Sequence, residues 1–442
     1  MVGRALLGRA VVAVVTAAAV TFALSGPADA ARLARSDFAA AAARYDVPPD
    51  LLVSLGWTQS RLDQRAVGRD GDCGIMQLST TRTLPAAATL TRMARADLCS
   101  DAAANIAGAA AVLRAYADEE GLDATGRADL NRWYGPIASF AGPVGDQIAR
   151  LFADTVYDQL ADGFDGPLRV EARPVAPDRG RYADVPAWGT VDDRSADHPP
   201  AVWAPAHKDN FEVANREKSG PIDFVVIHVT QGSYAGSIAW FQNPKSEVSA
   251  HYTFRSVDGA VTQSVREKDI GWHAANKDYN ARSIGIEHEG FIENPAWFTD
   301  AMYRSSAALT RILTRKYGIP RDRKHIIGHG EVPTADHTDP GPYWNWTYYL
   351  ELVNGNFLKG TGTVETPTGR LNVRSGPGTG YSTVGSVANG TKATIFCQRA
   401  GSKVTGTFGT STVWNRIGMN RWVSATYLRT SQPGFIPRVP HC

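Results

Sequence analysis

The sequence lacks any Cys-x-x-Cys pair, any strong excess of one charge and, beyond its first thirty residues, any long apolar run. The first absence argues against a zinc site built from cysteine. The formal net charge of only +2 argues against a dedicated nucleic-acid binder. The lack of a long apolar run after the first thirty residues argues against a membrane anchor, because a membrane-spanning helix needs ~20 consecutive apolar residues.

The one long apolar run lies at the N-terminus and is typical of an export signal. Arg4 and Arg9 precede the apolar residues 11–24, and small residues ending at Ala30 follow them. This order matches the basic, apolar and cleavage regions of a signal peptide. We therefore predict a signal peptide over residues 1–30 and a mature protein that is secreted and extracellular.

The four cysteines agree with export, because an even number of cysteines in an exported chain favours disulfides. Three pairings are possible in principle. We favour the two local ones, because each closes a loop within one predicted domain. These pairs are Cys73 with Cys99 and Cys397 with Cys442.

Composition divides the chain into three predicted domains, which fits the two to four expected for this length. The first is all-α, with apolar residues at helical spacing; the second mixes helices with strands in one central sheet; the third has the short alternating runs of a small β-barrel. The predicted boundaries are residues 31–165 for the all-α domain, 166–207 for a Pro-rich linker, 208–353 for the α/β domain, 354–362 for a second linker and 363–442 for the barrel.

Histidines concentrate in the predicted α/β domain. Seven of the ten lie between residues 228 and 337, and the loop 326–342 holds His329, His337 and Asp339 within eleven residues. Zinc binds imidazole nitrogen and carboxylate oxygen, and a catalytic zinc site uses three protein ligands. This loop can supply two of them, so a third has to come from elsewhere. His228 is available at the end of the apolar, β-branched run 222–229, which predicts a buried strand.

Three further elements can be predicted around these histidines. Residues 249–265 form a hairpin that turns at Asp258 and Gly259, and residues 299–317 form an amphipathic helix ended by Gly318. Residues 283–289 alternate as a strand, which puts His288 on a face with two isoleucines and Glu287 on the other face. His288 is therefore predicted to pack in the core, whereas Glu287 is either a solvated edge residue or functional.

Five motifs, in this order, resemble the zinc-dependent N-acetylmuramoyl-L-alanine amidases of the type 2, peptidoglycan-recognition-protein-like family. They are the Val-Val-Ile strand ending at His228, Ser-Ala-His-Tyr from residue 249, Gly-Trp-His-Ala from residue 271, Ser-Ile-Gly-Ile-Glu from residue 283, and Gly-His-Gly-Glu from residue 328 followed by His-Thr-Asp-Pro-Gly-Pro. The resemblance covers some 120 residues. It implies an enzyme that cleaves the amide bond between N-acetylmuramic acid and L-alanine in peptidoglycan.

The resemblance also implies roles for individual residues. Position by position, it makes His228, His329 and Asp339 the zinc ligands, Glu287 the catalytic acid and base, and His337 the donor that stabilises the oxyanion. Some members use a tyrosine before the Ser-Ala-His histidine, but this chain has Ala250 there, so it depends on the glutamate. We expect the remaining candidates to line the wall of the cleft, to orient the metal ligands or to bind substrate. These candidates are His251, Trp272 and His273.

The first domain is similar to lysozyme-like lytic transglycosylases, through the segment 38–62, Gly-Ile-Met-Gln-Leu from residue 74 and Asn-Arg-Trp-Tyr-Gly from residue 131. In that family a glutamate precedes the serine that is here Ser60, but this chain has Gln59. Cleavage of a glycan needs a carboxylic acid to protonate the glycosidic oxygen, and an amide cannot supply that proton. A domain that holds a glycan strand without cutting it is therefore expected, with simple helical packing as the alternative.

The last domain resembles bacterial SH3 domains, through Arg-Leu-Asn-Val-Arg-Ser-Gly-Pro-Gly from residue 370 and the region around Trp414 and Trp422. Such domains often bind cell-wall peptides, and the two tryptophans are either a binding platform or core. Two functions remain: a monomeric, exported zinc amidase acting on peptidoglycan, or a non-catalytic peptidoglycan-binding protein that keeps the fold. A complete ligand set with Glu287 present favours the enzyme.

Overall fold

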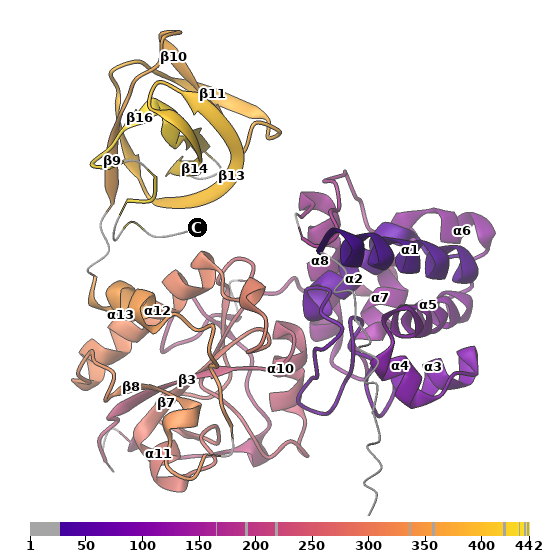
Figure 1. Ribbon diagram of the computed structural model, residues 1–442. Helices are drawn as coiled ribbons and strands as arrows, with labels where there is room; N and C mark the ends of the chain where they lie inside the picture. The colour runs from indigo at the N-terminus through magenta and orange to yellow at the C-terminus, as the bar shows by residue number, and fades with distance from the viewer. Residues whose placement is uncertain are drawn as a thin grey trace, which may run out of the picture.

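The computed structural model describes residues 27–164, 166–190, 193–216, 220–335, 337–355, 359–418, 421–432, 434–436, 439 and 442. The predicted signal peptide therefore lies outside the described residues, except for residues 27–30, which begin the first helix. Within the described part, no helix combines the length and the apolar character needed to span a bilayer. Figure 1 shows the three regions along the chain: helical, mixed α/β, and all-β.

The first region is helical, as predicted. The core face of α2 buries Leu51, Leu52 and Leu55 completely, and Pro49 occupies the first turn, where its missing N–H costs no hydrogen bond. The predicted Cys73–Cys99 disulfide joins the loop after α2 to α4. The helices are α1 (Pro27–Tyr45), α2 (Pro49–Ser60), α3 (Thr83–Thr91), α4 (Arg95–Ser100), α5 (Ala102–Glu119), α6 (Ala124–Ala128), α7 (Tyr134–Phe140) and α8 (Asp146–Asp162).

The segment predicted as a Pro-rich linker, 166–207, packs on both neighbouring regions. Leu168, Val170 and Tyr182 are buried in the apolar core of the helical region. Further along, β1 (Val202–Trp203) pairs in parallel with β5 and becomes an edge strand of the central sheet. Sparse apolar periodicity hid these contacts in the sequence, because single buried residues between prolines produce no regular pattern.

The central region contains one mixed six-stranded sheet flanked by helices, as predicted. The strand order is β1-β5-β4-β7-β3-β8, and only the β4–β5 pair is antiparallel. A separate two-stranded sheet pairs β2 (Phe211–Glu212) with β6 (Ile270–Gly271). The remaining strands are β3 (Phe224–Val229), β4 (Tyr252–Phe254), β5 (Val261–Gln263), β7 (Ser283–His288) and β8 (Ile326–Gly328), and the helices are α10 (Tyr234–Gln242), α11 (Lys277–Arg282), α12 (Asp300–Tyr317) and α13 (Trp346–Asn354).

The local predictions for this region are also confirmed. Strands β4 and β5 form the predicted hairpin, with Gly259 at a φ of 74° in the connection. Helix α12 begins after Thr299, whose side chain accepts a hydrogen bond from the backbone N–H of Met302, and ends at Gly318, which has a φ of 71°. His288 is buried against Trp344 and bonded to Ser306, so it packs in the core.

The third region is all-β. Strands β11, β10, β15, β14 and β13 form one sheet, and β12, β9 and β16 form another. Trp414 and Trp422 are buried beside Cys397, so both belong to the core rather than to a binding platform. The predicted Cys397–Cys442 disulfide is present. The strands are β9 (Gly360–Val364), β10 (Arg370–Arg374), β11 (Thr383–Ala388), β12 (Lys392–Ile395), β13 (Cys397–Gly406), β14 (Gly409–Gly418), β15 (Arg421–Ser424) and β16 (Leu428–Arg429).

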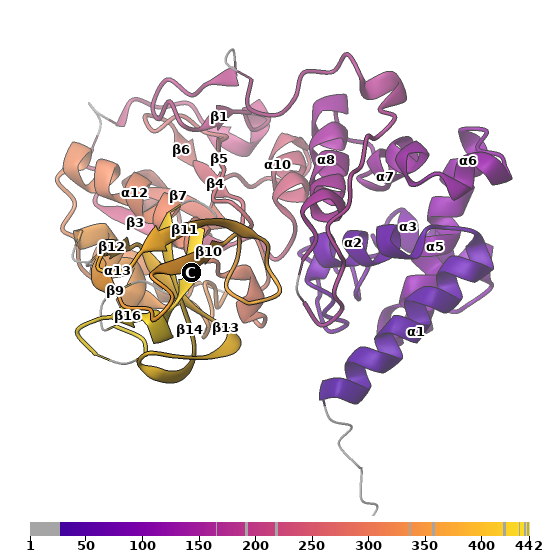
Figure 2. The same ribbon diagram turned by 90° about the horizontal axis from the view of Figure 1, so that it is seen from above.

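The helical region docks on the α/β region through α8 and α10, which lie side by side in Figure 2. Tyr234, Ala235 and Ile238 of α10 are buried in the same apolar cluster as the core of the helical region. Beside this contact, the guanidinium of Arg61 lies 4.1 Å from the centre of the Trp297 ring. Shared apolar burial and a buried cation on an aromatic face hold the two regions together.

Candidate metal centre

The structure brings His228, His329 and Asp339 together at one end of the central sheet. His228 lies near the end of β3, and His329 directly follows β8, the neighbouring parallel strand. Asp339 comes from the loop that follows. One potential ligand atom from each residue lies within 4.8 Å of the others, and all three side chains are buried. Parallel strands deliver their carboxyl ends to the same edge of a sheet, which is why residues 101 positions apart in the chain meet here.

The spacing and charge of these three residues fit a zinc ion. Asp339 Oδ2 lies 3.2 Å from His228 Nδ1, and Asp339 Oδ1 lies 3.1 Å from His329 Nδ1. Two ligand atoms that are each about 2.0–2.1 Å from a tetrahedral zinc ion are roughly 3.3 Å apart. Burial alone would raise the pKa of Asp339, but hydrogen bonds and charge from His228 and His329 outweigh it and hold this pKa well below its usual range. Asp339 is therefore a carboxylate, the form that binds metal.

His273 orients the first of these histidines. Its Nδ1 lies 3.0 Å from His228 Nε2, and its Nε2 lies 3.1 Å from Ser283 Oγ. Burial and the neighbouring His228 lower the pKa of His273 well below 6.5, so its ring is neutral. Gly285 makes room for this ring, since a Cβ at that position would lie 2.4 Å from His273 Cγ. His273 thus fixes the ring of His228 from behind, as partners of metal-binding histidines commonly do.

His251 is buried and does not lie at a cleft wall; its ring centre is 5.7 Å from that of His273, and a ligand-orienting role for it stays a prediction. The residue is fully buried, and its Nδ1 accepts a hydrogen bond of 3.0 Å from the backbone N–H of Gly285. Its Nε2 faces Arg216 and the Asp269 carbonyl. A ring without exposed surface cannot contact a substrate, so His251 instead fixes the backbone of β7. Trp272 is half-buried, and its carbonyl accepts a hydrogen bond from the Ser249 N–H.

Glu287 lies beside His228 on the same face of the sheet, because the two residues are direct partners in the parallel β3–β7 register. The residue as a whole is only 5% exposed. The one hydrogen bond to its carboxylate among the described residues comes from Arg69 of the helical region, whose Nη2 lies 3.4 Å from Glu287 Oε1. The Arg69 N–H also donates to the Gln231 carbonyl. No sequence motif marked Arg69.

His337 lies at the exposed rim of the site. Its ring is stacked on His329, with ring centres 4.8 Å apart and planes 20° apart. The side chain therefore approaches the cluster from the solvent side. The three-residue group that can hold a metal does not include it.

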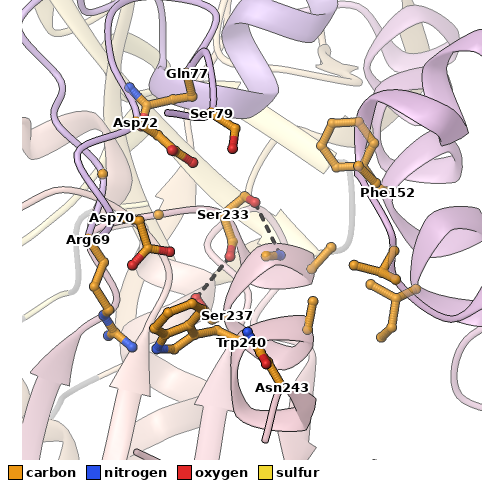
Figure 3. A pocket seen from close by; sticks show the side chains of 18 of the residues that line it. Arg69, Asp70, Asp72, Gln77, Ser79, Phe152, Ser233, Ser237, Trp240 and Asn243 are labelled. Carbon is orange, nitrogen blue, oxygen red and sulfur yellow. Dashed lines mark hydrogen bonds between the residues drawn. The ribbon is translucent and has the colours of Figure 1, made fainter. Parts of the chain in front are cut away.

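Gln59 is partly buried at the end of α2 and lines a cavity of about 840 Å³ between the helical and α/β regions. Figure 3 shows Gln77 and Ser79 of the helical region facing Ser233 and Trp240 of the α/β region across this space. Arg69 also lines it. The cavity therefore extends from the predicted glycan-binding position to the residue that contacts Glu287.

The α/β fold and the buried His–His–Asp cluster with a neighbouring carboxylate define an amidase-type hydrolase. Residues 218–342 match the family model described as N-acetylmuramoyl-L-alanine amidase; residues 36–143 match the transglycosylase SLT domain and residues 369–429 the bacterial SH3 domain. The chain is 38% identical to N-acetylmuramoyl-L-alanine amidase A of Achromobacter lyticus over 172 residues, which are 35% of this chain and 94% of that protein. The chain belongs to the N-acetylmuramoyl-L-alanine amidase family.

Two further proteins are similar to part of the chain. The 1,6-anhydro-N-acetylmuramyl-L-alanine amidase AmpD of Haemophilus influenzae is 39% identical over 113 residues, which are 24% of this chain and 59% of that protein. A solved crystal structure of a selenomethionine derivative of AmpD is 26% identical, with a TM-score of 0.29, and the match covers 35% of this chain and 94% of that one. Both similarities concern about a quarter to a third of the chain.

Proposed function

We propose that this protein is an exported, zinc-dependent amidase that cleaves the bond between N-acetylmuramic acid and L-alanine in peptidoglycan. One observation carries the proposal: a buried His–His–Asp cluster lies beside a buried carboxylate on the same face of one sheet. A protein that only binds peptidoglycan needs neither a metal site nor a base next to it.

His228, His329 and Asp339 would hold the zinc ion. When bound, zinc would lower the pKa of a coordinated water toward ~7 and polarise the carbonyl to be attacked. His273 keeps His228 in the orientation that binding requires, through the 3.0 Å contact described above.

Glu287 moves the protons of the reaction. Its carboxylate accepts the proton of the attacking water and then delivers it to the departing L-alanine nitrogen, a role typically worth ~10² to 10⁴ in rate. Arg69 holds this carboxylate in position through Oε1. His337 stands on the solvent side of His329, where a substrate carbonyl would enter, and donates a hydrogen bond to the developing oxyanion.

The outer domains bind the same substrate. Gln59 cannot protonate a glycosidic oxygen, so the lysozyme-like domain holds glycan without cutting it. The SH3 domain binds the wall, and the N-terminal segment directs export. We propose that the protein acts as a monomer outside the cytoplasm, with peptidoglycan as its partner.

Digestion of purified peptidoglycan sacculi, followed by mass spectrometry, tests the function. We expect free stem peptides and intact glycan strands. Failure to release peptides with zinc supplied would overturn the amidase proposal and favour the non-catalytic binding protein. In the same digest, 1,6-anhydro-N-acetylmuramic acid ends would show that the lysozyme-like domain is catalytic despite Gln59.

A further inference from the structure

We propose that the cavity between the lysozyme-like and amidase domains binds the glycan strand whose stem peptide the amidase removes. The ligand class is a chain of N-acetylated amino sugars. The inference rests on the proposed amidase function and adds to it a preference for polymeric strands over short muropeptides. The N-terminal domain thereby becomes part of the substrate site of the amidase domain.

The position of the cavity is the first observation that supports the proposal. One part of its wall is Gln59, at the end of α2. Another part is Thr230 and Gln231, which lie two and three residues after the metal-site residue His228. Between them, Arg69 lines the cavity and reaches Glu287 with its guanidinium. A strand lying here would pass the carboxylate that acts on its peptide branch.

The chemistry of the lining suits a sugar chain. Side-chain amides and hydroxyls face the cavity from both domains, together with the aromatic rings of Phe152 and Trp240 (Figure 3). Hydroxyls and acetamido groups both donate and accept hydrogen bonds, and so do these side chains. Ligand sites typically combine apolar and aromatic surface with a few polar groups that fix orientation, and the volume of about 840 Å³ lies within their usual range.

The charges of the lining favour an uncharged ligand backbone. Two arginines and two aspartates line the cavity, so the formal charge is balanced. Arg82 donates to the Phe140 carbonyl and to the Tyr116 hydroxyl, and Asp72 accepts from the Thr80 N–H. Arg69 is engaged with Glu287. No excess charge is left to select an anion or a cation, whereas hydrogen bonds and flat apolar faces remain.

The packed contact between the domains makes this a single site. The α8–α10 contact and the burial of Tyr234, Ala235 and Ile238 in the core of the helical domain fix both walls of the cavity relative to each other. A site built on packed helices is preorganised, so binding a strand does not require the domains to come together first.

A bulky residue on the cavity wall tests the proposal in the full-length mature protein. Thr81 is exposed and lines the cavity, so Thr81→Trp fills part of it without disturbing the core. Thr89 is an exposed threonine of the same domain, on α3 outside the cavity, and Thr89→Trp is the matched control. The substrates are strands that carry stem peptides and a monomeric muramoyl peptide. Binding is measured by calorimetry with peptide-free glycan strands.

For the wild-type protein and Thr89→Trp we expect strands to be cleaved with at least a tenfold higher kcat/KM than the monomer. In Thr81→Trp this ratio should fall about tenfold, and the affinity for peptide-free strands should fall with it.

An unchanged ratio of the two kcat/KM values together with unchanged strand affinity would overturn the inference, even if the monomer is cleaved. If the monomer and the strands are both left uncut, the proposed function fails, and the binding comparison alone decides about the cavity. Tighter binding of a chitin oligomer than of wall strands would overturn the assignment of the ligand.

Discussion

The guanidinium of Arg69 donates a hydrogen bond to Glu287 across 218 positions of sequence, from the lysozyme-like domain into the amidase domain. The Glu287 side chain is 7% exposed and that of Arg69 is 30% exposed. A mostly buried carboxylate beside the His–His–Asp cluster is thus held by a residue that lies outside the amidase family match, which covers residues 218–342. The position of this carboxylate depends on how the two domains dock.

Replacing Arg69 tests this dependence. We expect Arg69→Met to lower kcat about 10- to 100-fold with a smaller effect on KM, because loss of an orienting partner disturbs a reacting group more than it disturbs substrate binding. Arg69→Lys should restore part of the lost kcat, since it returns a cation without the planar fork. The measurement is steady-state kinetics on a monomeric muramoyl peptide. Equal kcat in all three proteins would remove Arg69 from the site.

Metal removal should inactivate the enzyme reversibly. Chelation is expected to abolish peptide release, and added zinc should restore it. Asp339→Ala should fail to recover even with zinc, because two imidazoles alone leave the site one ligand short. Zinc should also raise the melting temperature of the wild-type protein but not of Asp339→Ala, since a ligand that binds only the folded state stabilises it. Full activity of Asp339→Ala after chelation would contradict the assigned ligand set.

Restoring a carboxylic acid at position 59 should reveal the path of the glycan. Gln59→Glu places a partly buried carboxyl on the cavity wall, where burial favours its protonated form. We expect 1,6-anhydro-N-acetylmuramic acid ends in a sacculus digest, detected by mass spectrometry, and none with Gln59→Asn. If the glutamate variant binds strands as the parent does and still produces no such ends, the strand does not present a glycosidic bond to this position.

Buried histidines should make the amidase domain sensitive to acid. Burial lowers the pKa of His288 to about 3, below the value of about 6.5 in an unfolded chain. Between these two values the unfolded chain binds more protons, so the free energy of unfolding falls as the pH falls from about 6.5 toward 3. The slope contributed by one such histidine is at most about 1.4 kcal/mol per pH unit.

The acid effect can be measured by urea unfolding between pH 7 and pH 4.5, with a chelator present so that metal release does not contribute. His288→Gln should show a shallower loss of stability over this range than the wild type, whatever its stability at pH 7. His207→Gln, at a partly exposed position, is the control for replacing a histidine by glutamine. Parallel curves for His288→Gln and the wild type would show that His288 does not titrate on unfolding.

The sequence predicted the parts of the site that local patterns encode. His228 ends an apolar strand, and His329 follows one, and the two residues meet at one sheet edge because these strands pair in parallel. The alternation of β7 correctly separated Glu287 from His288. These features depend on residues within a few positions of each other along the chain.

The sequence could not predict contacts that arise from docking and from close packing. Arg69 reaches Glu287 only because two domains pack together, and no periodicity records that contact. His251 was expected at a cleft wall, yet its ring is buried against Gly271, and its Nδ1 accepts a hydrogen bond from the Gly285 N–H. The sequence shows glycines at positions 271 and 285 but not which side chain packs against each of them.

The short strand β1 makes the amidase sheet begin upstream of the segment that the family model recognises. A fragment cut at residue 218 would leave β5 as a bare edge, with unpaired N–H and carbonyl groups open to pairing with another chain. It would also expose the apolar face of α10 that the lysozyme-like domain covers. The amidase domain of this protein is therefore not a portable module, and engineered lytic enzymes built from it should retain the chain from residue 36 onward.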